Sequence, residues 1–416
     1  MRAPHPSLAG AVILGGAHGS LAVVRSLGRQ GIPVWFVTND HPIAKYSRYA
    51  TRALTWNGPD AEGAVDWLID LARQHGLDGW VLIAGGDAEV RLVAHHHAAL
   101  QSMYRVITPP WETTRWASDK QLAYRHATSV GVASPWSRFP TDRSEIASVD
   151  CRFPVILKPR SNEKRNAFTA AKAWRAEDRN ALILRYDEAA ALVGADAIIL
   201  QELIAGGGEA QFSYAGVWQD GAPIASLVAR RRRQFPVDFG FTSTFVETID
   251  KPEIEEAAER FLAPLRFTGL VEVEFKYDCR DGRYKLLDVN PRPWTWIGLG
   301  AAAGVDFPDI QWRLARGESV QRCRGRAGIG WTYVSRDIVS AVRQIANGTL
   351  SAGDYVRSLC RPLVFAAFAW DDPVPAVVDV PVVIGRILNR RLAEKREQQG
   401  KSSLPGAPDQ PSIVRR

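Results

Sequence analysis

The first hundred residues alternate short apolar runs with stretches of helical periodicity. The runs at Ala11–Leu14, Pro33–Val37 and Trp80–Ile83 have the length of buried strands, and residues 20–30 and 61–75 have the spacing of helices. Strand–helix–strand units with short connections form a parallel sheet with helices on both faces. The pattern therefore predicts a parallel α/β domain at the start of the chain.

The middle third of the chain is richer in short strands. Residues 118–130 read as a helix, with Ser118 or Asp119 as its N-cap. Apolar or alternating runs follow at 155–158, 197–201, 211–218, 224–229, 270–276 and 284–289. The last two runs flank Asp281-Gly282, a dipeptide typical of hairpin turns. This part is expected to be α+β rather than a continuation of the parallel sheet.

Changes in this pattern divide the chain into segments. The prolines at 109 and 110 mark the end of a first domain at residues 1–115, and the strand-rich part covers 116–320. Residues 321–393 contain a helical stretch at 335–346 and a proline-broken apolar stretch, to which the pattern assigns no role. Residues 394–416 are polar and rich in Gly, Pro, Ser and Gln, so we expect a disordered tail.

Composition indicates a globular protein. Hydrophobic residues make up 46% and charged residues 23%, and no run of about twenty apolar residues predicts a membrane span. The four cysteines lie far apart without a CxxC pair, so we expect reduced thiols and a cytoplasmic location. The net charge of +7 comes partly from Arg230–Arg233, either a solvated charge run or a basic rim for an anionic substrate. Nucleic acid is not expected as a partner.

The segment 269–292 carries the strongest candidate chemistry. Strand alternation places Glu272 and Glu274 on one face of the first strand, and Asp288 and Asn290 on one face of the second. Folding at the turn brings these oxygen-bearing side chains together, and Mg²⁺ prefers such ligands. Arg292 follows the second strand and presents a planar fork suited to phosphate or carboxylate. The alternative is a solvent-exposed hairpin face, where alternating charges are common.

The motif Asp288-Val-Asn290-Pro-Arg292 resembles the (E/D)xNxR signature of the ATP-grasp superfamily, and Glu274 matches the first metal-binding acid of that superfamily. The resemblance implies that Glu274, Asp288 and Asn290 hold Mg²⁺, with Mn²⁺ as an alternative ion, against the phosphates of ATP. It also implies catalytic roles for Arg292 and Asn290, with Arg292 meeting the transferred phosphoryl group or the substrate carboxylate.

Further motifs resemble the superfamily in the same order along the chain. Asp119-Lys120-Gln121 with the segment 131–135 is similar to its opening motif, Phe153–Pro159 to its lysine-bearing strand, and Ile199–Ile204 to its adenine hinge. The ATP-binding residues implied by this resemblance are Lys120, Lys158, Lys172, Gln201, Glu202, Leu203 and Glu209. One departure is that residues 160–167 contain no glycine where the family commonly has a glycine-rich phosphate loop.

The resemblance implies a multidomain α/β and α+β chain, in which a Rossmann-like pre-ATP-grasp domain precedes a two-lobed ATP-grasp fold. The small nucleotide lobe is expected at about residues 138–203. The implied activity is an ATP-dependent carboxylate–amine ligase that forms an acyl phosphate and releases ADP and phosphate. Its partners would be a small carboxylate and an amine, with amino acids as candidates, and a homodimer is one expected assembly.

Two alternatives stay open at this point. The stretch without glycine is compatible with a non-catalytic or regulatory ATP-binding module. The segment Gly15–Ser20 after the first strand is a weak match to a dinucleotide fingerprint, as in an NAD(P)-dependent oxidoreductase.

Overall fold

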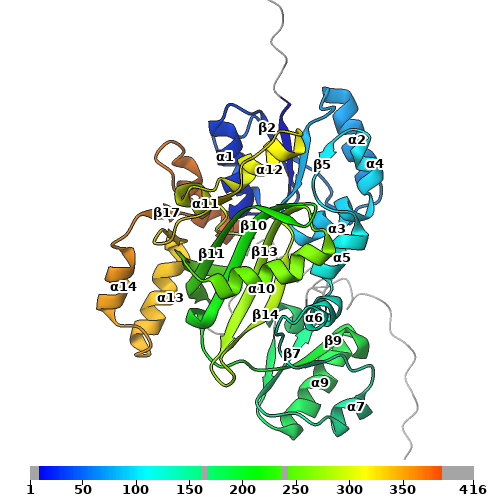
Figure 1. The fold of residues 1–416 in the computed structure, drawn as a ribbon, viewed down its shortest axis with the longest axis vertical. Helices are drawn as coiled ribbons and strands as arrows, with labels where there is room; N and C mark the ends of the chain where they lie inside the picture. The colour runs from blue at the N-terminus through cyan, green and yellow to red at the C-terminus, as the bar shows by residue number, and fades with distance from the viewer. Residues whose placement is uncertain (1–8, 161–165, 172, 237–241, 387–416) are drawn as a thin grey trace, which may run out of the picture.

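Three β-sheets stacked along the long axis organise the molecule (Figure 1). The computed structural model describes residues 9–160, 166–171, 173–236 and 242–386. The predicted combination of a parallel α/β domain with an α+β remainder is confirmed. None of the described helices is both long enough and apolar enough to cross a membrane.

The N-terminal sheet is parallel and has the strand order β3-β2-β1-β4-β5. Its strands β1, β2 and β4 are nearly fully buried, as the continuous apolar runs require. One face packs on α1 and the other on α2 and α3. The elements are β1 (Ala11–Leu14), α1 (His18–Arg29), β2 (Val34–Thr38), β3 (Arg52–Thr55), α2 (Ala64–His75), β4 (Val81–Ala84), α3 (Asp87–His95), α4 (His97–Gln101) and β5 (Arg105–Val106).

Two helices connect this domain to the rest of the chain, α5 (Trp111–Ser118) and α6 (Lys120–Ser129). Asp119 is the N-cap of α6, because its carboxylate accepts hydrogen bonds from the backbone N–H groups of Gln121 and Leu122. The cap places Lys120 at the first position of the helix, facing the sheets that follow.

A small antiparallel sheet with the order β6-β9-β7-β8 forms the lower lobe in Figure 1. Its apolar face packs against α7 and α9, which leaves the opposite face for Lys158 and Gln201. The elements are β6 (Ser137–Arg138), α7 (Arg143–Ser148), β7 (Val155–Pro159), α8 (Ala167–Ala171), β8 (Trp174–Ala176), α9 (Arg179–Val193) and β9 (Ile198–Glu202).

The central sheet has eight strands, ordered β14-β13-β10-β11-β12-β16-β17 with β15 beside β11. Val271, Val273 and Phe275 of β13 join the core cluster that also contains residues of α10, so Glu272 and Glu274 project from the opposite face. The elements up to residue 315 are β10 (Gln211–Gln219), β11 (Ala222–Phe235), β12 (Thr242–Ile249), α10 (Pro252–Leu262), β13 (Gly269–Asp278), β14 (Arg283–Asn290), α11 (Leu299–Ala303) and α12 (Phe307–Ala315).

The segment after residue 320 contacts both the central sheet and the N-terminal domain. It adds three short strands to the central sheet, and residues 374–386 are helical. Asp372 pairs with the buried Arg25 of α1 at 2.9 Å, and His18 lies 2.8 Å from Asp379. The elements are β15 (Cys323–Arg324), β16 (Gly330–Thr332), α13 (Val334–Ala346), α14 (Ala352–Leu359) and β17 (Leu363–Phe365). The domain boundaries stay predictions, and the tail 394–416 lies outside the described residues.

Candidate functional site

The β13–β14 hairpin brings the predicted ligand residues into register. Glu272 pairs with Asn290 and Glu274 with Asp288 across the two strands. Between Glu274 and Phe275 the register shifts by one residue, which makes Leu287 a bulged residue next to Asp288. The bulge interrupts the regular alternation of β14 directly before Asp288. Leu287 thereby becomes an apolar part of the cavity wall next to Glu274 and Asp288.

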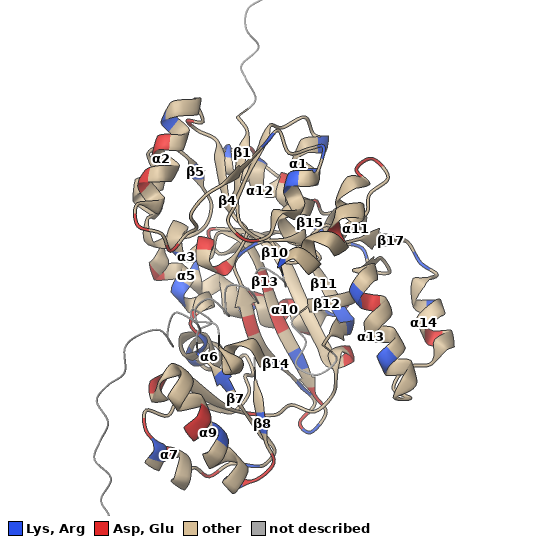
Figure 2. Cartoon of the chain, turned by 180° about the vertical axis from the view of Figure 1, so that it is seen from behind, with Lys and Arg blue, Asp and Glu red and all other residues tan. Residues whose placement is uncertain are grey.

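This cavity, of about 330 Å³, lies where the N-terminal domain, α6, the small sheet and the central sheet meet. It gathers six of the predicted site residues: Lys120, Lys158, Glu274, Asp288, Asn290 and Arg292. In the view from behind, acidic and basic segments both lie along the central strands that form its floor (Figure 2). The further lining residues are Asp87, Pro159, Ala173, Gln211, Arg231, Ser243, Glu272, Leu287, Trp294, Thr295 and Trp296.

The acidic floor of the cavity is built around Glu272, which is 4% exposed. Its carboxylate accepts hydrogen bonds from the Ser213 hydroxyl at 3.0 Å and the Trp296 indole at 3.1 Å. The Asn290 amide bridges Glu272 and Glu274, at 3.2 and 3.1 Å. Burial raises the pKa of Glu272 to about 7, and the adjacent Glu274 carboxylate adds to the rise.

Two cations contact the other acids of the floor. Arg231 donates to Glu274 at 3.2 Å, and the Lys120 ammonium lies 2.7 Å from Asp288. Burial alone would lower the pKa of Lys120, but the Asp288 carboxylate raises it above its ordinary value. Lys120 therefore carries its charge in this cavity at neutral pH.

Arg292 connects the hairpin to the N-terminal domain. Its guanidinium pairs with Asp87 at the start of α3, with one bond through Nε and a second through Nη2 at 3.2 Å. Nη2 also lies 3.4 Å from the Asn290 amide oxygen. Burial opposes the charge on Arg292, but Asp87 raises its pKa overall. The arrangement puts a guanidinium and an exposed carboxylate side by side at the wall of the cavity.

The small sheet contributes Lys158 from β7. Its ammonium donates a 2.8 Å hydrogen bond to the side-chain oxygen of Gln201 on β9. Lys120 and Lys158 therefore line one cavity from two separate structural units, α6 and the small sheet.

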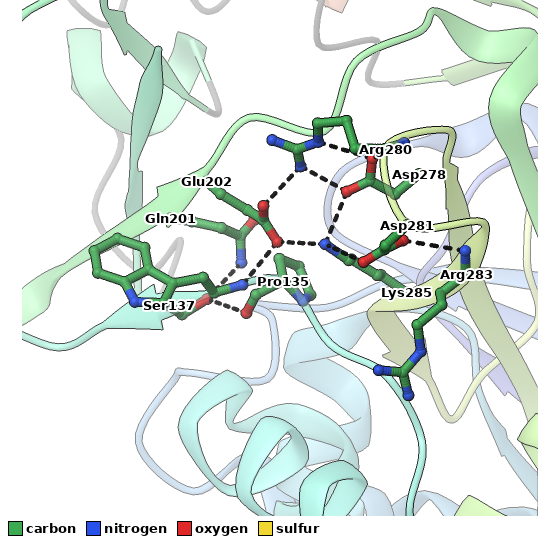
Figure 3. Close-up of polar contacts among 10 residues, drawn as sticks. Pro135, Ser137, Gln201, Glu202, Asp278, Arg280, Asp281, Arg283 and Lys285 are labelled. Carbon is green, nitrogen blue, oxygen red and sulfur yellow. Dashed lines mark hydrogen bonds and ion pairs between the residues drawn. The ribbon is translucent and has the colours of Figure 1, made fainter. Parts of the chain in front are cut away.

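The other predicted nucleotide residues lie away from these two lysines. The side chain of Glu202 turns to a second cavity, where it accepts hydrogen bonds from Lys285 and Arg280 (Figure 3). The backbone N–H of Leu203 donates to Pro154 at 3.4 Å, and the Glu209 carboxylate accepts from the Gly207 N–H. Lys172 lies outside the described residues. The roles of these residues stay predictions.

The donor set suits a divalent ion by its chemistry. Carboxylate and amide oxygens from Glu272, Glu274, Asp288 and Asn290 are hard ligands of the kind that Mg²⁺ takes together with phosphates and water. In the arrangement described, no three His, Cys, Asp or Glu side chains of the described residues already converge as a metal site. Arg231 contacts Glu274 and Lys120 contacts Asp288 instead. Metal binding would therefore require these two cations to turn toward another anion.

Two participants were named in the sequence analysis without being assigned a role of their own. Glu272 shares a strand face with Glu274, as the alternation predicted, but the resemblance assigned only Glu274 to the metal. Arg231 belongs to the basic run 230–233, which is not simply a solvated charge run. Arg231 faces the cavity, whereas Arg233 is 3% exposed and pairs with Asp337 on α13.

Solved structures of low sequence identity share this fold. The biotin carboxylase domain of the 2-oxoglutarate carboxylase from Hydrogenobacter thermophilus, solved with MgADP and bicarbonate, matches with a TM-score of 0.63 and 16% identity, over 78% of this chain and 74% of that one. An L-amino acid ligase from Bacillus licheniformis matches with a TM-score of 0.54 and 15% identity over 74% of each chain. An N5-carboxyaminoimidazole synthetase from Staphylococcus aureus matches with 0.58 and 14%, over 76% and 79%.

The chain therefore shares the fold of these solved structures, and together with a family model described as ATP-grasp this confirms, at the level of the fold, the resemblance stated from the motifs. More narrowly, a family model described as "ATP-grasp in the biosynthetic pathway with Ter operon" matches residues 217–336, which include β11, β12 and the whole β13–β14 hairpin. No curated protein matches the chain in sequence.

Proposed function

We propose that the protein is an Mg²⁺·ATP-dependent ligase that activates a small carboxylate as an acyl phosphate and joins it to an amine. One observation carries the proposal: Lys120 and Lys158 from separate structural units share a cavity with the acidic hairpin and with Arg292. Lysines suited to phosphate, oxygen ligands suited to Mg²⁺ and a guanidinium suited to an anionic substrate are the parts that phosphoryl transfer needs. The fold neighbours include an L-amino acid ligase, which supports a ligase activity.

In this reaction a carboxylate oxygen of the substrate attacks the γ-phosphorus of ATP, and ADP leaves with the electron pair of the broken P–O bond. The amine then attacks the acyl carbon, phosphate leaves, and the amine loses a proton to give an amide. Lys120 and Lys158 hold the ATP phosphates, and Arg292 orients the transferred group. Mg²⁺ held by Glu274, Asp288 and Asn290 would offset the charge on the phosphates.

A dinucleotide at the Gly15-Gly16 loop is less consistent with the surroundings of that loop. The Glu89 carboxyl group lies so close that a Cβ on Gly15 would come within 2.2 Å of it, and one on Gly86 within 2.3 Å. Burial raises the pKa of Glu89 to about 7. A carboxyl group beside the loop repels a diphosphate when it is ionised. We therefore place the nucleotide in the cavity at the hairpin and not at this loop.

The test is ATP turnover with Mg²⁺ against pooled carboxylates and amines, amino acids included, with ADP and AMP separated. The proposal predicts ADP and phosphate with particular pools only, and loss of turnover in the Asp288→Ala/Asn290→Ala variant. AMP and pyrophosphate would contradict the acyl-phosphate route. Tight ATP binding without turnover in any pool would favour the non-catalytic module.

A further inference from the structure

Asp87 connects the N-terminal domain to the cavity at the hairpin. It is the first residue of α3 and follows the carboxyl end of β4. In the order β3-β2-β1-β4-β5 the chain reverses its direction across the sheet between β1 and β4. Ligands of parallel α/β sheets bind at such a switch point, outside the carboxyl ends of the strands. Here α3 lies on the side of the domain that faces the central sheet, and Asp87 and Arg292 line the same cavity (Figure 1).

The Asp87 carboxylate is charged and can accept a further hydrogen bond. Its side chain is 66% exposed where it lines the cavity. Desolvation by the surrounding protein opposes the charge, but the guanidinium of Arg292 lowers the pKa of Asp87 below its ordinary value. A carboxylate has about four lone-pair sites, and the two bonds from Arg292 use two of them. The remaining sites can accept from an ammonium group.

Arg292 likewise keeps one edge of its guanidinium for a second anion. Its Nε and Nη2 atoms donate to Asp87. Its other contacts are long, because Nη1 lies 3.4 Å from the backbone oxygen of Pro293 and Nη2 lies 3.4 Å from the amide oxygen of Asn290. Ordinary N–H···O hydrogen bonds measure about 2.7–3.2 Å, so these two contacts are weak. A carboxylate can replace them as a bidentate partner while Asp87 stays in place.

The two groups together complement a zwitterion. Asp87 and Arg292 are in direct contact, and the ammonium and carboxylate groups of an α-amino acid are separated by a single carbon atom. We propose that the carboxylate substrate is an α-amino acid, with its ammonium group held by Asp87 and its carboxylate by Arg292; this inference rests on the proposed ligase activity. Contact with Asp87 favours the protonated form of the bound amine. A protonated amine is not a nucleophile, so the amine that forms the amide comes from a second molecule.

The experiment measures hydroxamate formation with Mg²⁺·ATP and hydroxylamine, which captures an acyl phosphate whatever the natural amine is. One pool contains the common α-amino acids as racemates, and the other contains the same acids with hydrogen in place of the ammonium group. At equal low concentrations, wild type should react about 30-fold faster with the amino acid pool, the size expected for one hydrogen bond to a charged group. Equal rates with the two pools, or no hydroxamate from the amino acid pool, would overturn the inference.

A second arm asks whether Asp87 causes the preference for the ammonium group. Asp87→Asn should lower the rate with amino acids about tenfold and change the rate with the matching acids less than about twofold. The control Asp66→Asn removes an exposed carboxylate from the first turn of α2, away from the cavity, and should keep the full preference. Equal losses with both pools in Asp87→Asn would indicate that Asp87 acts only on the fold or on Arg292, and would contradict the ammonium contact.

Urea unfolding checks that each variant folds. If Asp87→Asn does not fold, Asp87→Ser carries the test, because it also removes the charge, and a full preference for amino acids in this variant would contradict the inference. Asp87→Glu keeps a carboxylate and should retain part of the preference. Failure of every class of pooled carboxylate to release ADP would refute the ligase activity itself, which is a separate outcome from a ligase that does not distinguish the two pools.

Discussion

Acidic and basic side chains lie at both ends of the β13–β14 hairpin, but they are paired differently at the two ends. At the turn end, Lys285 contacts Glu202, Asp278 and Asp281, and Arg280 contacts Glu202 and Asp278 (Figure 3). Every carboxylate of this network touches a cation. The hydrogen bonds from Arg280, with those from Lys285, hold the pKa of Asp278 well below its usual range.

At the open end, two of the cations contact one acid each, and Glu272 accepts the hydrogen bonds described for it from neutral donors. Arg231 contacts Glu274 and Lys120 contacts Asp288, whereas Glu272 accepts from Ser213, Asn290 and Trp296. Burial raises the pKa of Glu272 to about 7 where that of Asp278 falls. These contacts favour a stabilising role for the turn end, and the open end is the part of the hairpin that we propose binds Mg²⁺ and ATP.

The largest effect is expected from neutralising the open end. Glu274→Gln with Asp288→Asn removes two oxygen anions of the cavity and should weaken Mg²⁺·ATP binding about 1,000-fold, or about 4 kcal/mol. The fold should be retained, because Arg231 and Lys120 can turn to solvent. Calorimetric titration with Mg²⁺·ATP measures the affinity, and urea unfolding checks the stability. An unchanged Mg²⁺·ATP affinity would contradict the assignment of ligand binding to the open end of the hairpin.

Neutralising the turn end should affect stability instead. Asp278→Asn places amide hydrogens against Arg280 and Lys285 and should lower the free energy of unfolding by about 3 kcal/mol, as for a broken buried pair. The matched control is Asp220→Asn, whose exposed pair with Arg266 should contribute little. Denaturant unfolding of both variants makes the comparison. Equal stabilities of the two variants would show that the turn end is not a stabilising network.

The buried Glu89 predicts a pH dependence of stability. Its pKa in the folded protein is about 7 against an ordinary 4.5, so the native state keeps a proton that the unfolded state has lost. Unfolding free energy should therefore fall as pH rises from 4.5 to about 7, on the order of 2 kcal/mol more in wild type than in Glu89→Gln. Urea unfolding at pH 5 and pH 8 measures this difference, and parallel profiles would contradict it.

The smallest effect concerns the helix that presents Lys120. Asp119→Ala removes the N-cap of α6 and should cost about 1 kcal/mol of stability, whereas Asp119→Ser keeps a capping oxygen and should cost less. Thermal unfolding of the two variants measures the difference. Equal losses would assign the effect to the 3.1 Å pair with Arg160 and not to the cap.

Local patterns were sufficient for much of the fold. Apolar runs of four to five residues predicted β1, β2 and β4, and Asp281-Gly282 predicted the turn that β13 and β14 flank. Strand alternation predicted that Glu274 and Asp288 share a face. These features depend on neighbours within one or two strands, which a single sequence displays directly.

Features set by distant contacts were not predictable in this way. Asp87 lies 205 positions from Arg292, and no local spacing shows that they pair. The direction of Glu202 depends on Lys285 and Arg280, which approach from another sheet. Likewise, β15, β16 and β17 are too short to stand alone, and they become strands by pairing with β11, β12 and β16, respectively.

The most direct test of the central claim is calorimetric titration of the wild-type protein with ATP, first with Mg²⁺ and then with EDTA. Because the acids of the open end are proposed to bind ATP through the metal, affinity should be high with Mg²⁺ and at least tenfold lower with EDTA. Equal affinities in the two conditions, or no binding in either, would contradict the assignment of the hairpin cavity as an Mg²⁺·ATP site.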